Sequence, residues 1–232
     1  MSDETGALAA SATDPVRPAA GAALFYVYVA AFHLLWIFWP YLLYPRLTLA
    51  LGDRTLSYAV VQLTIRVLFW VAPVWLYLRY VDGVEPFEYL KLTHNVRRGF
   101  VVALVLTMIN VVGMLLRFGV PHPSLSRVTW NSMLGTSLLV GVIEEIPYRG
   151  FMLQKLAARM PFWRANVITS ALFLVIHLPG WLALHTFRLE TAITIFIFGL
   201  IMAAVFKLAG SLWAPIVTHS ANDCLSFVVF GL

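Results

Sequence analysis

Seven stretches of the chain, each about twenty residues long and mostly apolar, constrain its fold more than any other feature. A helix needs ~20 apolar residues to cross a bilayer, and it pairs all its backbone N–H and C=O groups internally. We therefore predict an all-α fold, a polytopic membrane helix bundle with seven transmembrane helices. Splitting the first or the fourth stretch would give eight. The stretches run roughly over 22–44, 58–80, 99–118, 132–159, 165–186, 190–207 and 211–231.

The composition supports an integral membrane protein and argues against a nucleic-acid partner. The chain is 61% hydrophobic and 12% charged, whereas a soluble domain is roughly 25% charged. The net charge of +5 is spread over loops, without a basic run or an RNA-binding motif. Residues 1–20 are polar and are expected to form a disordered tail, followed by a single transmembrane domain over 21–232. Cys224 is the only cysteine, so the chain forms no internal disulfide.

The basic residues predict the orientation of the bundle. With seven spans, one side of the membrane receives more Arg and Lys than the other, and the richer side is normally cytoplasmic. The N-terminus is therefore expected in the cytoplasm, and the protein in the cell (inner or plasma) membrane as a multi-pass protein. The richer side holds Arg17, Arg79, Lys91, Arg97, Arg98, Lys155, Arg159, Arg164 and Lys207, and the other side holds Arg46, Arg54, Arg117, Arg127 and Arg188.

Three of the apolar stretches contain ionisable residues at membrane depth. An ionisable group there costs at least ~2.5–3.5 kcal/mol on insertion scales, so such groups mark functional sites. Glu144 and His177 each lie about 12 residues into their stretch, which is ~18 Å at 1.5 Å per residue. His219 and Asp223 lie ~12 and ~18 Å into the last stretch. All four fall in the middle of a ~30 Å bilayer core and are expected to line one polar cavity.

Spacing within the helices predicts the supporting contacts. Glu145 and Arg149 are four residues apart, so they share a helix face and should form an ion pair. Glu144 points about 100° away and is free to meet another helix. His219 and Asp223 also share a face, and Asn222 is expected to hydrogen-bond between helices. Pro147 removes a backbone donor and predicts a local kink.

Arg66 also lies in an apolar stretch, and we expect it to snorkel or to find an intrahelical partner.

These residue types together are suited to peptide-bond hydrolysis inside the membrane. Glu144 with His177 can hold and deprotonate a water, and His219 with Asp223 can stabilise the oxyanion or orient the water. The same four residues also offer a two-His, two-carboxylate set for Zn²⁺. The sequence lacks His-Glu-x-x-His, so nothing in it fixes a metal geometry. We therefore favour no cofactor, with zinc as the alternative.

The chain resembles the CPBP family, which comprises the type II CAAX prenyl endopeptidases and bacterial relatives that include bacteriocin-processing and self-immunity proteins. The resemblance covers about 130–228 and rests on three motifs in order. It implies a glutamic-type intramembrane endopeptidase in which Glu144 and His177 activate water and His219 with Asp223 forms the oxyanion site. Pro147 and Asp223 depart from the commoner family pattern, which has Asn at the last position. The motifs stand here as Glu144-Glu145-Ile146-Pro147-Tyr148-Arg149, Phe173 to His177, and His219 to Asp223.

The expected substrate is a peptide or protein with a membrane-associated C-terminal segment, cut near that end. Whether it is prenylated is not determined by the sequence. Two other functions fit the same residues. A non-enzymatic immunity or scaffold protein could keep the polar core for structure, and a proton-coupled transporter could use buried Glu and His as a relay. Against the transporter, the seven spans show no inverted halves.

Overall fold

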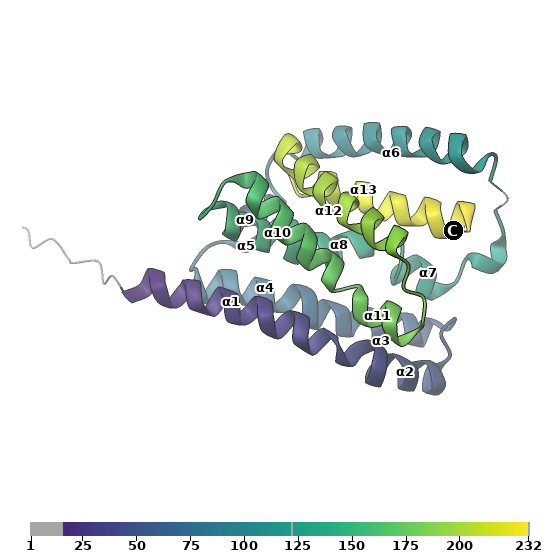
Figure 1. Cartoon of the computed structure of the whole chain (residues 1–232), viewed down its shortest axis with the longest axis horizontal. Helices are drawn as coiled ribbons and strands as arrows, with labels where there is room; N and C mark the ends of the chain where they lie inside the picture. The colour runs from purple at the N-terminus through teal and green to yellow at the C-terminus, as the bar shows by residue number, and fades with distance from the viewer. Residues whose placement is uncertain (1–15, 122, 232) are drawn as a thin grey trace, which may run out of the picture.

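The computed structural model describes residues 16–121 and 123–231, and every regular element within them is helical (Figure 1). This confirms the predicted all-α class. The elements that carry most of the chain are long helices packed side by side, joined by short turns at the two ends of the bundle. Residues 1–15, which make up most of the predicted disordered tail, lie outside the described part.

The first two spans each consist of α-helical and wider π-helical pieces. The first begins at Val16, several residues earlier than predicted, and Pro40 and Pro45 coincide with its changes of helix type. Proline lacks the N–H that would continue the α-helical ladder, which favours such a change. The pieces are α1 (Val16–Trp36), η1 (Trp39–Leu43) and α2 (Tyr44–Leu51), then α3 (Leu56–Arg66), η2 (Val67–Val71), α4 (Ala72–Leu76) and η3 (Tyr77–Val81).

The third span is one uninterrupted helix, and the fourth is broken. The short helix α5 (Pro86–Tyr89) leads to α6 (Val96–Phe118). The sequence predicted a continuous fourth helix from about 132 to 159, and this is wrong, because the chain turns at 135–139. The pieces are η4 (Leu125–Arg127), α7 (Trp130–Leu134), α8 (Val140–Glu145), η5 (Ile146–Leu153) and α9 (Gln154–Ala157).

The last part of the chain returns twice across the bundle and then ends within it. Helix α10 is packed along α12, and α13 is packed against both α6 and α8, so α13 lies inside the bundle (Figure 1). The elements are α10 (Phe162–Val175), α11 (Leu178–Ala183), α12 (Leu189–Ala209), α13 (Trp213–Asp223) and η6 (Cys224–Phe230).

Five helical stretches in the described residues are long and apolar enough to cross a membrane. The predicted count of seven to eight is not confirmed. The two predicted spans that fall short are the fourth and the seventh, which carry the acidic pair and the His219 motif. They are more polar and largely buried among the other helices, so they need no lipid-facing apolar surface. The five are Ala23–Leu51, Leu56–Val81, Val96–Phe118, Phe162–Ala183 and Leu189–Ala209.

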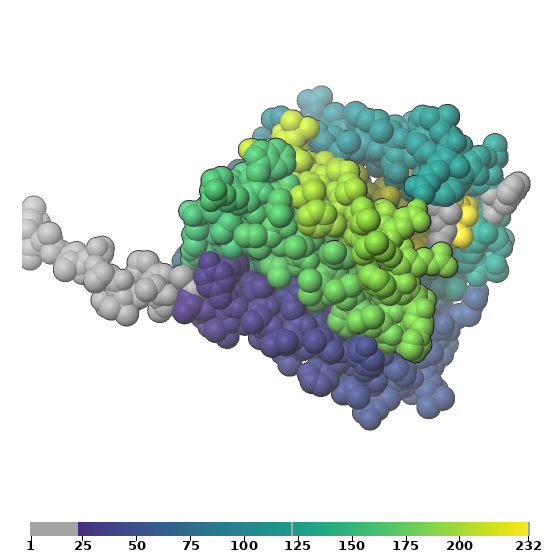
Figure 2. All heavy atoms as spheres, viewed as in Figure 1, coloured from purple at the N-terminus to yellow at the C-terminus, as the bar shows by residue number. Residues whose placement is uncertain are grey.

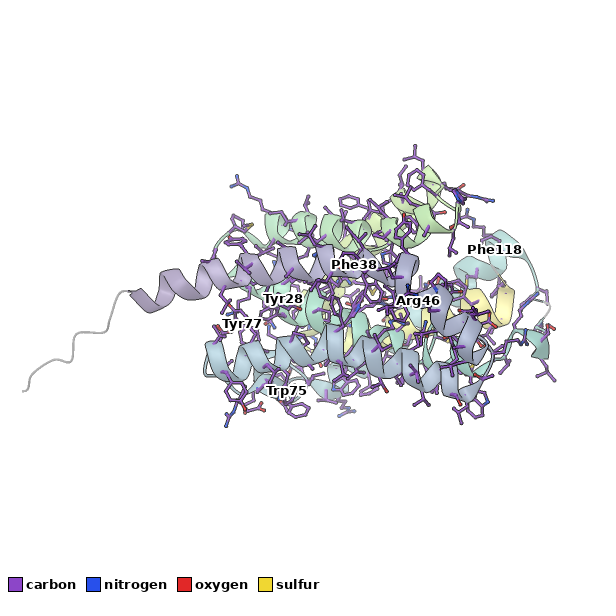
Figure 3. The ribbon with its side chains drawn as sticks, turned by 90° about the horizontal axis from the view of Figure 1, so that it is seen from below. Tyr28, Phe38, Arg46, Trp75, Tyr77 and Phe118 are labelled. Carbon is purple, nitrogen blue, oxygen red and sulfur yellow. The ribbon has the colours of Figure 1, made fainter. Side chains whose placement is uncertain are left out.

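The outer surface of these helices is apolar, as a bilayer requires. Phe38 on the first span and Leu116 on α6 are both exposed, at 53% and 84%. Figure 3 shows side chains such as Phe38 around the bundle, with Tyr28 and Tyr77 in the first two spans. The rings of Tyr28 and Tyr77 lie 6.3 Å apart and join α1 to η3. Exposed apolar area of this extent indicates a membrane-facing surface.

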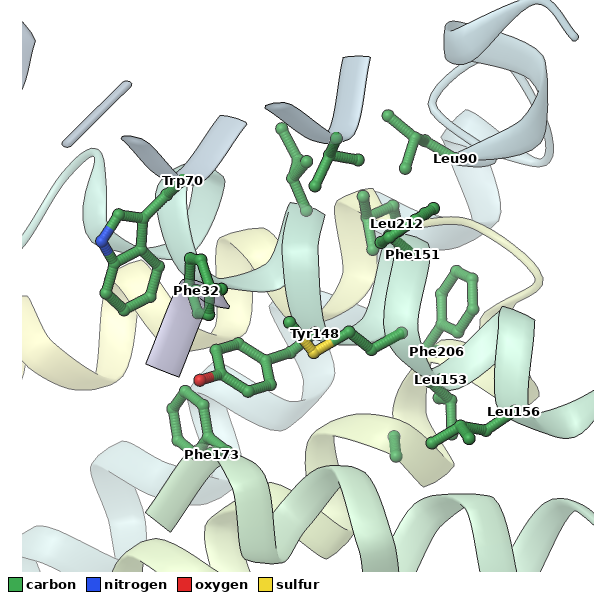
Figure 4. Close-up of a cluster of buried hydrophobic side chains, with 14 of the residues drawn as sticks. Phe32, Trp70, Leu90, Tyr148, Phe151, Leu153, Leu156, Phe173, Phe206 and Leu212 are labelled. Carbon is green, nitrogen blue, oxygen red and sulfur yellow. The ribbon is translucent and has the colours of Figure 1, made fainter. Parts of the chain in front are cut away.

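An aromatic cluster around Tyr148 forms the centre of the core (Figure 4). The ring of Tyr148 lies between Phe32 of α1 and Phe173 of α10, at centroid distances of 6.2 and 5.1 Å. Its hydroxyl lies 3.2 Å from Nε2 of His33. Aromatic pairs add roughly 0.5–1.5 kcal/mol each beyond the area they bury. This cluster holds η5, and with it the acidic pair, against the first span and α10.

Candidate active site

The acidic pair ends helix α8 at a change of helix type. Glu144 is 7% exposed and Glu145 is fully buried. Pro147 follows in η5, where the backbone widens into π-helical turns. The local kink that the sequence predicts at this position stays a prediction. Such π-helical turns are often found at functional sites. The two carboxylates therefore point in different directions from adjacent positions and meet different partners.

Glu145 is held by two bases. Its Oε1 accepts a hydrogen bond from Nη1 of Arg149 at 3.0 Å, which confirms the predicted ion pair. The same oxygen lies 2.7 Å from Nδ1 of His219. Arg149 is 1% exposed, donates to the Gly199 carbonyl at 3.0 Å, and stacks over the Phe173 ring at 4.5 Å. Because an ionised carboxylate only accepts, His219 donates its Nδ1 proton to Glu145.

Glu144 meets a partner that the sequence analysis did not predict. Its Oε1 accepts from Nη2 of Arg66 at 2.7 Å, and both side chains are 9% exposed. The expectation that Arg66 snorkels or pairs within its own helix is therefore wrong. The other oxygen, Oε2, faces Nε2 of His219 at 4.0 Å. The sequence signal for this ion pair was an arginine in the middle of an apolar stretch, because a charged group in such a stretch needs a counter-ion.

His219 and Asp223 share a face of α13, as their spacing predicted. Nε2 of His219 lies 3.8 Å from Oδ2 of Asp223, which is beyond hydrogen-bond distance. Asp223 instead accepts from Nδ2 of Asn222 at 3.0 Å, and Asn222 accepts from Nδ2 of Asn110 at 3.1 Å. The expected interhelical role of Asn222 is thus confirmed. Asn110, an amide within an apolar span, was missed.

His177 lies just beyond the end of α10, where the chain bends into α11. Its Nδ1 donates to the Phe173 carbonyl at 2.7 Å, so in the neutral ring Nε2 is unprotonated and can accept a proton. The ring is half-buried and lies 4.9 Å from Phe173 and 5.6 Å from Trp181. Among the described residues no direct hydrogen bond joins His177 to Glu144. A water molecule on which both side chains act would therefore lie between them.

All four residues predicted to be catalytic line one cavity of about 690 Å³. Its polar floor also includes Arg66, Asn110 and Asn222, whereas Glu145 and Arg149 lie behind His219 and do not line it. The walls formed by α6 and α12 combine apolar and polar side chains. Figure 2 shows a recess between the teal atoms of α6 and the yellow-green atoms of α12. The remaining lining residues include Met114, Phe118, Val140, Phe173, Trp181, Ile195, Phe198 and Phe227.

Apolar side chains on α6 and α12 form part of the cavity walls, and the floor presents carboxylate, imidazole and guanidinium groups. The arrangement supplies bases, donors and space for water within a bundle of apolar helices.

In the described residues, no group of three or more His, Cys, Asp or Glu side chains is arranged to hold a metal ion. The four residues proposed as zinc ligands line one cavity, but as placed they do not converge on one point.

Residues 126–225 match the family described as Type II CAAX prenyl endopeptidase Rce1-like. The match covers the three motifs and confirms the resemblance that they carry, and it overlaps the predicted motif region of 130–228. It supports a CAAX-type endopeptidase at the level of the family. No curated protein and no solved structure matches the chain.

Proposed function

We propose that this chain, a relative of the CAAX-type endopeptidases, hydrolyses a peptide bond of a membrane-associated protein or peptide near its C-terminus. One observation carries the proposal. Glu144, His177, His219 and Asp223 come from three separate helical segments and line a single cavity inside a membrane bundle. Acids and imidazoles brought together in this way supply the general base and the oxyanion stabiliser that hydrolysis needs.

In the proposed mechanism Glu144 is the general base. Its Oε1 is occupied by Arg66, and its Oε2 faces Nε2 of His219 at 4.0 Å. A water that bridges two polar atoms at this separation can be hydrogen-bonded to both. Glu144, assisted by Nε2 of His177, removes a proton from such a water as the oxygen attacks the substrate carbonyl. The same carboxyl then gives this proton to the amide nitrogen as the C–N bond breaks and the amine leaves. Positioned bases of this kind contribute ~10²–10⁴-fold to the rate.

His219 is proposed to stabilise the developing oxyanion. Glu145 accepts its Nδ1 proton at 2.7 Å, and Arg149 holds Glu145 from the other side. With Nδ1 fixed in this way, a doubly protonated ring presents an Nε2–H donor to the cavity. Asp223, 3.8 Å from Nε2, keeps the ring in place and balances its charge. Removing one such donor costs ~10²–10³ in kcat.

The protease and the non-enzymatic immunity or scaffold protein predict different outcomes in one experiment, and the zinc-dependent version of the protease is distinguished by metal removal, as described in the Discussion. The purified protein in proteoliposomes is incubated in H₂¹⁸O with two internally quenched peptides. One ends in a farnesylated CAAX sequence, and the other in an unmodified apolar tail. The protease proposal predicts a cleaved product that carries one ¹⁸O in its new carboxylate, with His219→Ala inactive and the exposed control His94→Ala active. Intact peptides in every sample would favour the non-enzymatic protein.

We also propose that the N-terminus is cytoplasmic. Contacts place the basic loops at one end of the bundle: Lys155 pairs with Asp82 at 2.5 Å, and the Leu212 N–H donates to the Lys91 carbonyl. Reporter fusions at the loops 82–95 and 119–129 test this. The proposal predicts a cytoplasmic signal from the first loop and an external signal from the second.

A further inference from the structure

Arg66 is a buried cation in the first half of the chain, outside the residues 126–225 that match the protease family. It is 8% exposed and lies in the second span, where an unpaired guanidinium would be costly. Its Nη2 donates to Oε1 of Glu144 at 2.7 Å across 78 positions of sequence. The proposed general base therefore depends on a contact from a part of the chain that carries none of the family motifs.

Two groups besides Glu144 fix the guanidinium in place, the Gly135 carbonyl and the Trp70 ring. Its Nη1 donates to the carbonyl oxygen of Gly135, in the turn between α7 and α8. Its Cζ lies 5.7 Å from the centre of the Trp70 ring, one turn further along the same span. Gly135 allows the turn between α7 and α8 to lie close to α3, because a Cβ at this position would lie 2.5 Å from Oε1 of Gln62. Arginine suits this site because its planar fork of donors can hold two acceptors at once.

The contact leaves Glu144 with one occupied and one available oxygen. Oε1 is bound by Arg66, and Oε2 is turned toward Nε2 of His219 at 4.0 Å. The adjacent Glu145 has an arginine of its own, Arg149. Each carboxylate of the pair thus has a separate cation, and the two cannot exchange partners without moving α3 against α8.

We propose that Arg66 is a positioning residue for hydrolysis: it binds Oε1 of Glu144 and so holds Oε2 toward the attacking water. This rests on the proposed function, since it assigns the role through Glu144. The first half of the chain is then a required part of the active site, in addition to forming the membrane bundle.

The test compares Arg66→Met and Arg66→Lys with Arg98→Met, an exposed arginine at the basic end of α6. The proteins are purified as monodisperse fractions, and kcat and KM are measured in proteoliposomes with whichever of the two quenched peptides the wild type cleaves. We expect Arg66→Met to lower kcat at least ~100-fold with KM within about twofold, because the loss falls on the transition state. Arg66→Lys keeps the charge but not the two-point grip, and should recover about a tenth of wild-type kcat.

A purely structural role predicts something else. Both Arg66 variants would then show lower yields and melting temperatures, but the folded fraction would turn over at the wild-type rate. That result overturns the inference. If Arg66→Met gives no folded protein, Arg66→Lys decides alone, and wild-type kcat in that variant also overturns it. Glu144→Gln distinguishes failure of the proposed function from failure of this inference. Activity in Glu144→Gln defeats the proposed function, whereas an inactive Glu144→Gln beside wild-type kcat in Arg66→Lys defeats only the role of Arg66.

Discussion

Nδ1 of His219 lies 2.7 Å from Oε1 of Glu145, although the two residues are 74 positions apart in the chain. The contact fixes the ring orientation of His219 and keeps its Nδ1 protonated, since the carboxylate accepts that proton. Glu145, the predicted partner of Arg149, therefore contacts both Arg149 and the imidazole of His219 in α13. Glu145 lies outside the cavity and contacts His219, whereas Glu144 lines the cavity.

This arrangement predicts a strong stability coupling between Glu145 and Arg149. Both side chains are essentially buried, so Arg149→Met leaves a buried carboxylate without its cation. Breaking a buried pair costs about 3–5 kcal/mol, whereas replacing both partners costs much less. We expect Arg149→Met to lower the melting temperature strongly in detergent, and Glu145→Gln/Arg149→Met to regain part of the loss. A double variant no more stable than the single variant would contradict the coupling.

Gly141 is predicted to set the distance between α8 and α13. A Cβ at this position would lie 2.2 Å from the Ile216 carbonyl oxygen and 2.7 Å from Oγ of Ser220. Gly141→Ala must push the two helices apart, and overpacking of this kind costs about 1–3 kcal/mol. Because Glu144 and His219 lie on these helices, activity should fall as well. Gly180→Ala is the matched control, since nothing lies within 4 Å of its Cβ position, and it should leave melting temperature and activity unchanged.

His177→Ala should lower kcat by ~10²-fold or more if Nε2 of His177 assists the base. Within the described part of the chain, the imidazole hydrogen-bonds only to the nearby Phe173 carbonyl, so its loss should change the melting temperature little. His94→Ala, at an exposed position, is the control for histidine substitution. Wild-type turnover in His177→Ala would remove His177 from the mechanism.

Metal dependence is tested by removing metal. The glutamic-type proposal predicts unchanged turnover after dialysis against 1,10-phenanthroline and EDTA, with less zinc than protein by elemental analysis. Loss of activity that returns with added Zn²⁺ would instead establish the metalloprotease alternative.

The sequence predicted the convergence of the site well, because depth and spacing are local properties. Twelve-residue offsets into separate apolar stretches placed Glu144 and His177 at one level, and the four-residue spacing of Glu145 and Arg149 fixed their contact. It could not predict which carboxylate faces which base. The expected His219–Asp223 contact measures 3.8 Å, and the ring is bound by Glu145 instead. That choice depends on the packing of α13 against α8.

The other errors have the same origin. Arg66 was assigned a local partner because no spacing rule links α3 to α8. Residues 135–139 form a turn that interrupts the fourth stretch. Gly135 lies there so close to Gln62 that a Cβ would be 2.5 Å from Oε1 of that side chain. Interhelical contacts of this kind are formed by tertiary packing and leave no periodic signal in the sequence.

Glu144 is proposed to activate water in the cavity shared with His177 and His219. The most direct test is kcat/KM of Glu144→Gln for whichever quenched peptide the wild type cleaves, measured on folded protein beside Glu88→Gln, whose glutamate is exposed in α5. We expect a loss of at least ~10³-fold in Glu144→Gln and wild-type turnover in Glu88→Gln. Equal turnover in the two variants would contradict it.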